Sequence, residues 1–307
     1  GKQNITKEDI DVVIAALQSD YLTQGPRIKE FEDHFANYVG SKFAVAVSNV
    51  TAALHLCTLE LGVQEGDKVI TTPITFAASA NCVRYCGGEV VFSDINPETY
   101  LLDIKKVKSL LENAPKGTYK GIIPVDFAGR AVDLEAYRKL ADEYNLWIIE
   151  DACHAPGGSF SDSKNTIQKC GNSNFADLAI FSFHPVKHIA CGEGGMVTTN
   201  DSAYAEICDQ LRNHGSSVSE EIRHKGPKPY LLPDFNLLGF NYRMTDLQGA
   251  VGVVQMDKLS SFIKERQQWA NFYCEELADI NWLRMPFRPT EGQHAWQSFV
   301  THVDPAL

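Results

Sequence analysis

The sequence predicts an α/β protein with a mostly parallel central sheet covered by helices. Short apolar runs alternate along the chain with segments of helical periodicity, a rhythm typical of such sheets. Some runs are continuously apolar, as expected for strands buried on both faces, and residues 146–150 are the clearest case. The chain has 307 residues, of which 44% are hydrophobic and 22% charged. These ordinary globular values allow one large domain and a smaller one.

The first segments read as two helices. Thr6 can serve as an N-cap, and apolar residues follow it at helical spacing: Ile10, Val13, Ile14 and Leu17. Gly25 and Pro26 then break the chain. A second apolar periodicity ends at Gly40 and consists of Ile28, Phe31, Phe35 and Tyr38. Gly1 is not an initiator methionine, and no signal-peptide core follows it, so we expect the beginning of the protein to be missing.

The alternation of strands and helices occupies the middle of the chain. Strands are predicted at 43–47, 68–71, 90–92, 122–125, 146–150, 178–183 and 196–199. Helices are predicted between them at 51–61, 76–85, 104–111, 134–144 and 203–212. Two polar stretches, 161–174 and 215–231, are expected to be long surface loops.

The C-terminal part predicts the start of a second unit. Residues 245–262 and 264–277 read as two helices, and 296–303 as a β-like run that no further element closes into a sheet. We therefore expect a large domain at 1–245 and, at 246–307, the start of a smaller C-terminal α/β domain that is incomplete. The first of these helices is apolar enough that it must pack on the large domain or on a partner.

Charge and composition exclude several classes of function. The formal net charge of −11 argues against sequence-independent nucleic-acid binding, which needs a basic face. No apolar run is long enough to span a membrane. The eight cysteines form no Cys-x-x-Cys pair and have no zinc-finger spacing, so they read as reduced, buried cytosolic thiols. The sequence thus predicts a cytoplasmic protein without a metal site.

Chemically useful side chains follow the apolar runs, where ligand sites collect in parallel sheets. Asp151 and His154 follow the run at 146–149, and Lys187 follows Ser182 after the run at 180–183. Val50 and Thr51 open the helix after the run at 45–47, and Phe76 follows the run at 69–73. Together they offer a carboxylate, an amine, a helix N-terminus with hydroxyls and an aromatic ring.

This set suits a cofactor with a cationic ring nitrogen, an aldehyde and a phosphate. Asp151 would keep the ring nitrogen protonated, and Lys187 could supply the amine if burial lowers its pKa. The first-turn amides of Val50 and Thr51 would bind the phosphate, with the Ser182 hydroxyl beside them. Phe76 could stack on the ring, and three glycines would let the backbone pass close to a bulky ligand: Gly192, Gly194 and Gly195.

Each residue alone has a simpler interpretation. A single lysine is usually solvated, an aspartate after a strand usually caps a turn, and a phenylalanine usually fills the core. Cys153 and His154 could suggest a nucleophile and its base, but neighbours on a strand point to opposite faces. A nicotinamide dehydrogenase is disfavoured because no Gly-x-Gly-x-x-Gly follows a strand.

The order of the motifs is more specific than any one residue. The chain resembles the DegT/DnrJ/EryC1/StrS sugar aminotransferases, a fold-type-I pyridoxal-phosphate group, from about Ile5 to its end. The matching stretches are Leu22 to Pro26, Ser48 to Leu54, Thr72 to Phe76, Glu150 to Ala155, Phe181 to Lys187, Gly192 to Gly195, Arg212 to Gly215 and Gly239 to Asp246.

The resemblance implies a role for each matching residue. Lys187 is the Schiff-base lysine for pyridoxal 5'-phosphate, Asp151 is the partner of the pyridine nitrogen, and His154 lies beside the ring. Phe76 stacks on the ring, and the phosphate is held by Val50, Thr51 and Ser182. Asn241 reaches the phosphate of the neighbouring subunit's cofactor, which implies a homodimer with shared active sites.

The resemblance also implies a substrate class. Residues 72–81, 124–129 and 184–187 look most like the enzymes of pseudaminic acid biosynthesis, which aminate C4 of a UDP-linked 4-keto-6-deoxy-N-acetylhexosamine. Glutamate is the usual amino donor in the family. A GDP- or dTDP-4-keto-6-deoxyhexose aminotransferase of the perosamine type remains an alternative. A non-catalytic regulatory protein that binds pyridoxal phosphate is the alternative from another class.

Overall fold

A seven-stranded sheet forms the centre of the computed structural model, which describes residues 3–218, 230 and 233–303. The strand order is β1-β9-β8-β5-β4-β2-β3. β9 is antiparallel to both of its neighbours, and the other pairs are parallel, which confirms the mostly parallel sheet. The strands are β1 (Phe43–Val47), β2 (Lys68–Thr71), β3 (Glu89–Phe92), β4 (Tyr119–Ile123), β5 (Trp147–Asp151), β8 (Leu178–Ser182) and β9 (Gly195–Thr199).

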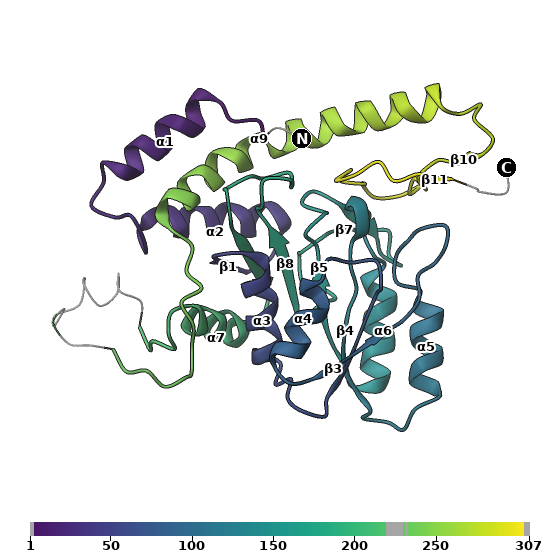
Figure 1. Cartoon of the computed structure of the whole chain (residues 1–307), viewed down its shortest axis with the longest axis horizontal. Coiled ribbons are helices and arrows are strands. Elements are labelled where there is room, and N and C mark those ends of the chain that lie inside the picture. Colours follow the sequence, from purple (N-terminus) through teal and green to yellow (C-terminus); the bar gives the residue numbers. More distant parts are fainter. Residues whose placement is uncertain (1–2, 219–229, 231–232, 304–307) are drawn as a thin grey trace.

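Helices cover both faces of this sheet (Figure 1). On β8, Leu178 and Ile180 pack with the helices α3, α4 and α7, whereas Phe181 lies in a cluster with α2 and α9. A third cluster joins the sheet to α5 and α6. The helices are α1 (Lys7–Leu17), α2 (Pro26–Val39), α3 (Val50–Glu60), α4 (Ala78–Tyr85), α5 (Ile104–Glu112), α6 (Leu134–Tyr144), α7 (Ser202–Arg212) and α9 (Asp246–Glu276).

The polar stretch 161–174, predicted as a loop, is in part a β-hairpin. β6 (Ser159–Ser161) pairs antiparallel with β7 (Ile167–Lys169), and the Asp162 carboxylate accepts hydrogen bonds across the turn. The prediction was wrong because these short strands lack the alternation of a half-buried strand. The second predicted loop, 215–231, lies largely outside the described residues.

The C-terminal part differs from the prediction in two ways. Residues 245–277, predicted as two helices, contain the single helix α9 of 31 residues, since no Gly or Pro interrupts the junction near Lys264. The end of the β-like run is paired, because β11 (His302–Val303) lies antiparallel to β10 (Leu283–Arg284). α9 packs on α1 and α2, so its buried Met256 and Leu259 contact the chain's own core. The proposed division into domains at residue 245 stays a prediction.

Helix α1 forms as predicted, but its apolar residues face outward. Ile10, Ile14 and Leu17 are exposed, whereas Asp9 is buried. Asp9 accepts a hydrogen bond from Gln255 at 2.9 Å and pairs with Lys258 at 2.5 Å, both on α9. A polar contact therefore sets the rotation of α1 on α9, overriding the apolar stripe.

Two compositional predictions bear on the fold. All eight cysteines are free thiols; seven are buried and Cys86 is half-buried. Among the described residues, no helix combines the length and apolar character needed to cross a bilayer.

Candidate active site

A cavity of about 1290 Å³ opens at the carboxyl ends of the parallel strands. Asp151 ends β5 and Ser182 ends β8, while the N-terminus of α3 follows β1. Seven of the eight predicted site residues line this cavity: Val50, Thr51, Phe76, Asp151, His154, Ser182 and Lys187. The structure thus brings together residues that lie up to 137 positions apart in the chain (50 to 187).

Lys187 lies in a turn after β8, where its backbone N–H donates to the carbonyl of His184 at 2.8 Å. Burial lowers the pKa of its amine below the ordinary value, although the nearby Cys153 and Asp151 raise it in part. No hydrogen bond or ion pair to its Nζ occurs among the described residues. A lowered pKa and a free amine are the properties of a nucleophilic lysine.

Asp151 lies at the buried end of β5, and its two carboxylate oxygens have separate donors. The Ser79 hydroxyl donates to Oδ2 at 2.7 Å, and the Cys153 N–H donates to Oδ1 at 3.2 Å. The cavity therefore contains a buried carboxyl group that two hydrogen bonds hold in place, where a cationic group can meet it.

His154 is held in one tautomer by the backbone. The Ala128 N–H donates to Nδ1 at 3.2 Å, so the neutral ring carries its proton on Nε2. Burial, with a contribution from Lys187, lowers the pKa of His154 to about 4. The ring is thus neutral near pH 7 and presents an N–H donor.

The N-terminus of α3 offers unpaired backbone donors to the cavity. The Asn49 side chain caps the helix by accepting from the Ala52 N–H at 2.9 Å. Among the described residues, the N–H groups of Val50 and Thr51 have no acceptor. Two amides at the positive end of a helix form an anion site.

Gly195 allows this helix end to lie close to β8 and β9. A Cβ at Gly195 would lie 2.7 Å from the Asn49 carbonyl carbon and 2.8 Å from the Val50 nitrogen. Ser182 pairs with Gly195 across the strands, so its hydroxyl lies at the same corner as the α3 N-terminus. The predicted role of Gly195 was space for a ligand, but the structure shows that it makes room for this helix.

Two predicted residues are exposed. Phe76 lies at the rim of the cavity with 76% of its surface exposed, so stacking on a ring stays a prediction. Asn241 is exposed and does not line the cavity, although its neighbour Tyr242 does. Its predicted role in a neighbouring subunit stays a prediction.

The expectation that Cys153 and His154 point to opposite faces is wrong. Both residues line the cavity, because β5 ends at Asp151 and the following turn does not alternate. Burial and Asp151 instead raise the pKa of the Cys153 thiol well above its ordinary value, and His154 Nδ1 is occupied by Ala128. An inactive thiol beside a histidine with an occupied Nδ1 is no nucleophile.

Several residues of the site were missed in the sequence. Ser79 supports Asp151 and bonds to the Thr75 hydroxyl at 2.8 Å, and the spacing of these two hydroxyls at the start of α4 was an available signal. His55 and Tyr242 form a wall of the cavity and lie 3.2 Å apart between Nδ1 and the phenol oxygen. No local pattern signals that wall, because its residues lie 187 positions apart.

A family model matches almost the whole chain. The DegT/DnrJ/EryC1/StrS aminotransferase family matches residues 3–306. The chain belongs to this family. It is therefore a pyridoxal-phosphate-dependent aminotransferase of the sugar aminotransferase group, with the fold-type-I architecture that the resemblance implied.

Individual family members show the same likeness. The spore coat polysaccharide biosynthesis protein SpsC of Bacillus subtilis is 36% identical over 300 residues, covering 98% of this chain and 74% of SpsC. The aminotransferase of Psychrobacter cryohalolentis has a TM-score of 0.90 at 28% identity, covering 100% of this chain and 77% of its own. Helicobacter pylori PseC, an aminotransferase involved in pseudaminic acid biosynthesis, has a TM-score of 0.86 at 28% identity, with 99% and 77% covered.

The residues of the cavity fit the cofactor of this family. An amine of lowered pKa, a buried carboxylate and an anion-binding helix end match an aldehyde, a ring nitrogen and a phosphate respectively. The fit rests on residues of this chain, and it agrees with the family's dependence on pyridoxal phosphate.

Proposed function

We propose that this aminotransferase moves an amino group from glutamate to the C4 ketone of a nucleotide-linked 4-keto-6-deoxy sugar. UDP-4-keto-6-deoxy-N-acetylhexosamine is the first candidate. The observation that carries the proposal is the convergence of Lys187, Asp151 and His154 in one cavity of a sugar aminotransferase. SpsC and PseC, whose names refer to polysaccharide and pseudaminic acid biosynthesis, support a sugar as the acceptor.

Lys187 is the proposed covalent anchor and proton carrier. When bound, the cofactor supplies an electron-withdrawing ring that makes the C–H bond beside the reacting nitrogen acidic. With its Nζ free, Lys187 would act as the base that takes up this proton and as the acid that gives it back on the other side of the reacting nitrogen. The lowered pKa of Lys187 supports this role, since a neutral amine can accept a proton.

Asp151 and the α3 corner are proposed to bind the two ends of the cofactor. The Asp151 carboxylate, fixed by Ser79, would keep the ring nitrogen protonated through a charge-assisted hydrogen bond. The amides of Val50 and Thr51 and the Ser182 hydroxyl would hold the phosphate. Phe76, at the rim, would cover the ring when it stacks. His154 would contribute its neutral ring and Nε2–H beside the cofactor.

The size of the cavity supports a second ligand beside the cofactor. Sites for one small molecule commonly enclose about 300–1,000 Å³. The cavity here is about 1290 Å³, with Phe76 and Tyr85 exposed at its edge. A space of this size with aromatic side chains at its rim suits a nucleotide sugar.

We also propose a homodimer in which Asn241 of each chain completes the site of the other. Asn241 is exposed and does not line the cavity of its own chain, which leaves it available to a neighbouring subunit and supports this assembly. The apolar helix no longer supports it, since Met256 and Leu259 pack within the chain.

A substrate panel tests the proposed function. The protein is incubated with pyridoxal phosphate, glutamate and UDP-, GDP- or dTDP-linked 4-keto-6-deoxy sugars, and products are identified by mass spectrometry. We expect an amino sugar and an equal amount of 2-oxoglutarate with the UDP-N-acetylhexosamine. Amination of only the GDP or dTDP sugar would move the assignment to the perosamine type. Release of 2-oxoglutarate without amination of any sugar would reject a nucleotide sugar as acceptor.

A further inference from the structure

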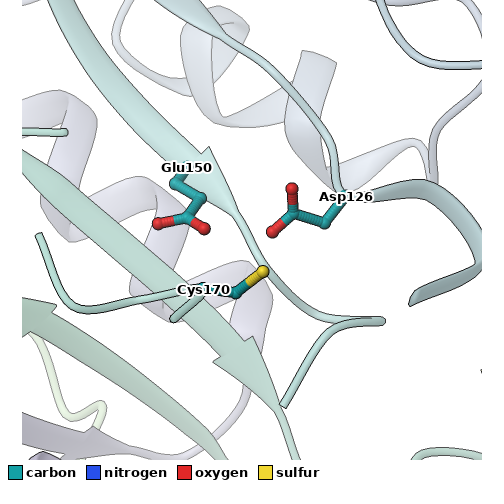
Figure 2. Close-up of side chains that lie close together, drawn as sticks. All are labelled: Asp126, Glu150 and Cys170. Carbon is teal, nitrogen blue, oxygen red and sulfur yellow. The ribbon is translucent and has the colours of Figure 1, made fainter. Parts of the chain in front are cut away.

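Two buried carboxyl groups lie on the opposite side of β5 from the cavity. Asp126 and Glu150 each expose 1% of their surface, and one oxygen of each carboxyl group lies within 4.8 Å of the other and of the Cys170 sulfur. Figure 2 shows the two carboxyl groups facing each other with the thiol beside them. We call Asp126 and Glu150 the carboxyl pair.

Each member of the pair has one satisfied and one unsatisfied oxygen. The Val132 N–H donates to Asp126 Oδ1 at 2.8 Å, and the Gly171 N–H donates to Glu150 Oε2 at 3.0 Å. Asp126 Oδ2 and Glu150 Oε1 are buried without a hydrogen-bond partner among the described residues. A proton on either oxygen would form a hydrogen bond between Asp126 and Glu150, and both oxygens would then have a partner.

No positive charge compensates the pair. Among the described residues, no Lys, Arg or His forms an ion pair or hydrogen bond with Asp126 or Glu150. The titratable groups that face them are Asp151 on β5, Cys153 in the turn that follows it and Cys170 after β7. Two ionised carboxylates in such surroundings would carry a large desolvation cost and repel each other.

The pair lies beneath the part of the site that orients His154. The Asp126 N–H donates to the Asp151 carbonyl at 3.0 Å, and the Asp126 carboxyl holds the turn through Val132. Within this turn Ala128, at a φ of +60°, presents its N–H to His154. Movement of Asp126 would therefore be transmitted to His154.

We propose that Asp126 and Glu150 share one proton, and that this protonated pair is a positioning device that fixes the 125–130 turn and with it His154. The sharing itself does not depend on the enzyme's substrate. Its consequence for catalysis rests on the role proposed above for His154.

The acidities of the two groups support the geometry. Burial raises the pKa of Asp126 to about 6, and burial together with Asp126 raises the pKa of Glu150 well above its ordinary value. An acid whose pKa is raised by folding contributes stability that is fully present below the unfolded pKa, near 4. For Asp126 that contribution is lost as the pH rises from about 4 to the folded pKa of about 6, and for Glu150 the loss extends to higher pH, because its pKa is raised well above the ordinary value.

Infrared spectroscopy of the full chain tests the proton. Glu60 is first changed to Gln, because burial raises its pKa to about 7 and would add a second protonated carboxyl. We expect E60Q to show a carboxylic acid C=O band at pH 7 that is absent from E60Q/D126N/E150Q. The absence of a difference band would overturn the shared proton. One equivalent of bound metal in wild type that is missing from D126N/E150Q would overturn it as well.

Nitrogen NMR of the His154 ring tests the positioning. In wild type, the Nδ1 signal should change over the same pH range in which the infrared band disappears, and this comparison needs no variant. In D126N/E150Q, two amides replace the acids, and an amide does not lose a proton in this pH range. The His154 Nδ1 signal should therefore stay constant. D126A should shift it at every pH. An unchanged signal in D126A, or the same pH-dependent change in D126N/E150Q, would overturn the positioning role.

Discussion

The Ser79 hydroxyl donates a 2.7 Å hydrogen bond to Oδ2 of Asp151, from the first turn of α4 to the end of β5. Both side chains are buried, with 0% and 5% of their surface exposed. The bond holds the carboxyl group of Asp151 in a fixed orientation. The proposed partner of the cofactor's ring nitrogen is thus oriented before any ligand binds.

The first prediction removes this orientation. In Ser79→Ala, Asp151 loses one donor but keeps the Cys153 N–H, so we expect turnover to fall about 10-fold, the effect of one hydrogen bond to a charged group. Thr75→Val is the control, because among the described residues the Thr75 hydroxyl forms its hydrogen bond with Ser79, and its removal leaves the bond to Asp151 in place. Steady-state kinetics should show a larger loss in Ser79→Ala than in the control, and equal losses would contradict the role of Ser79.

The second prediction removes the charge of Asp151 and keeps its shape. Asp151→Asn should lower turnover by about 100-fold or more, because a charge-assisted hydrogen bond worth about 3 kcal/mol is lost. Cofactor should still bind through the α3 corner, and absorbance titration with pyridoxal phosphate measures this separately. Near-normal turnover in this variant would rule out the proposed role.

The third prediction concerns protonation of buried histidines. Burial lowers the pKa of His154 to about 4 and those of His188 and His294 to about 3, below the ordinary value of 6.5. A histidine with a lowered folded pKa contributes stability above the unfolded pKa, and this is lost as the pH falls through the folded pKa. For His154 alone, the difference corresponds to about 3 kcal/mol.

Proton NMR should therefore find these three rings neutral at pH 5.5, and the His154 ring should gain its proton only as the pH approaches 4. His34 and His302, two exposed histidines, provide reference signals in the same spectra. Titration of the His154 ring near pH 6.5 would show that it is solvated, contrary to the structure.

The fourth prediction tests shared active sites. An inactive Lys187→Ala chain is mixed with an inactive Asn241→Ala chain. In a mixed dimer, one site would combine both defects and the other would carry neither, so part of the activity should return. Failure to recover activity despite proven subunit exchange would mean that each site is built from one chain.

The sheet and the positions of Asp151 and Lys187 in the site could be predicted because the sequence patterns that mark them are local. Continuous apolar runs mark β5 and β8, and the chemistry of Asp151 and Lys187 follows each run directly. In parallel strands, carboxyl ends meet at one edge, so local order along the chain becomes proximity in space.

Other features depend on contacts that no local pattern contains. Asp9 is buried on account of Gln255 and Lys258, which are more than 240 residues away. The hairpin at 159–169 is polar apart from Phe160 and Ile167, and Ser159 also pairs with Gln293. The carboxyl pair joins Asp126 to Glu150 across two strands, and neither residue is unusual in its own segment.

The central claim is that Lys187 is the covalent anchor of the cofactor. The full chain is loaded with pyridoxal phosphate, reduced with borohydride, digested and analysed by mass spectrometry. We expect the reduced cofactor on the peptide that contains Lys187, and neither adduct nor turnover in Lys187→Ala. Lys169, a surface-exposed lysine that contacts Tyr38, is the matched control, and Lys169→Ala should retain both. An adduct on any other lysine, with Lys187 unmodified, would contradict the assignment.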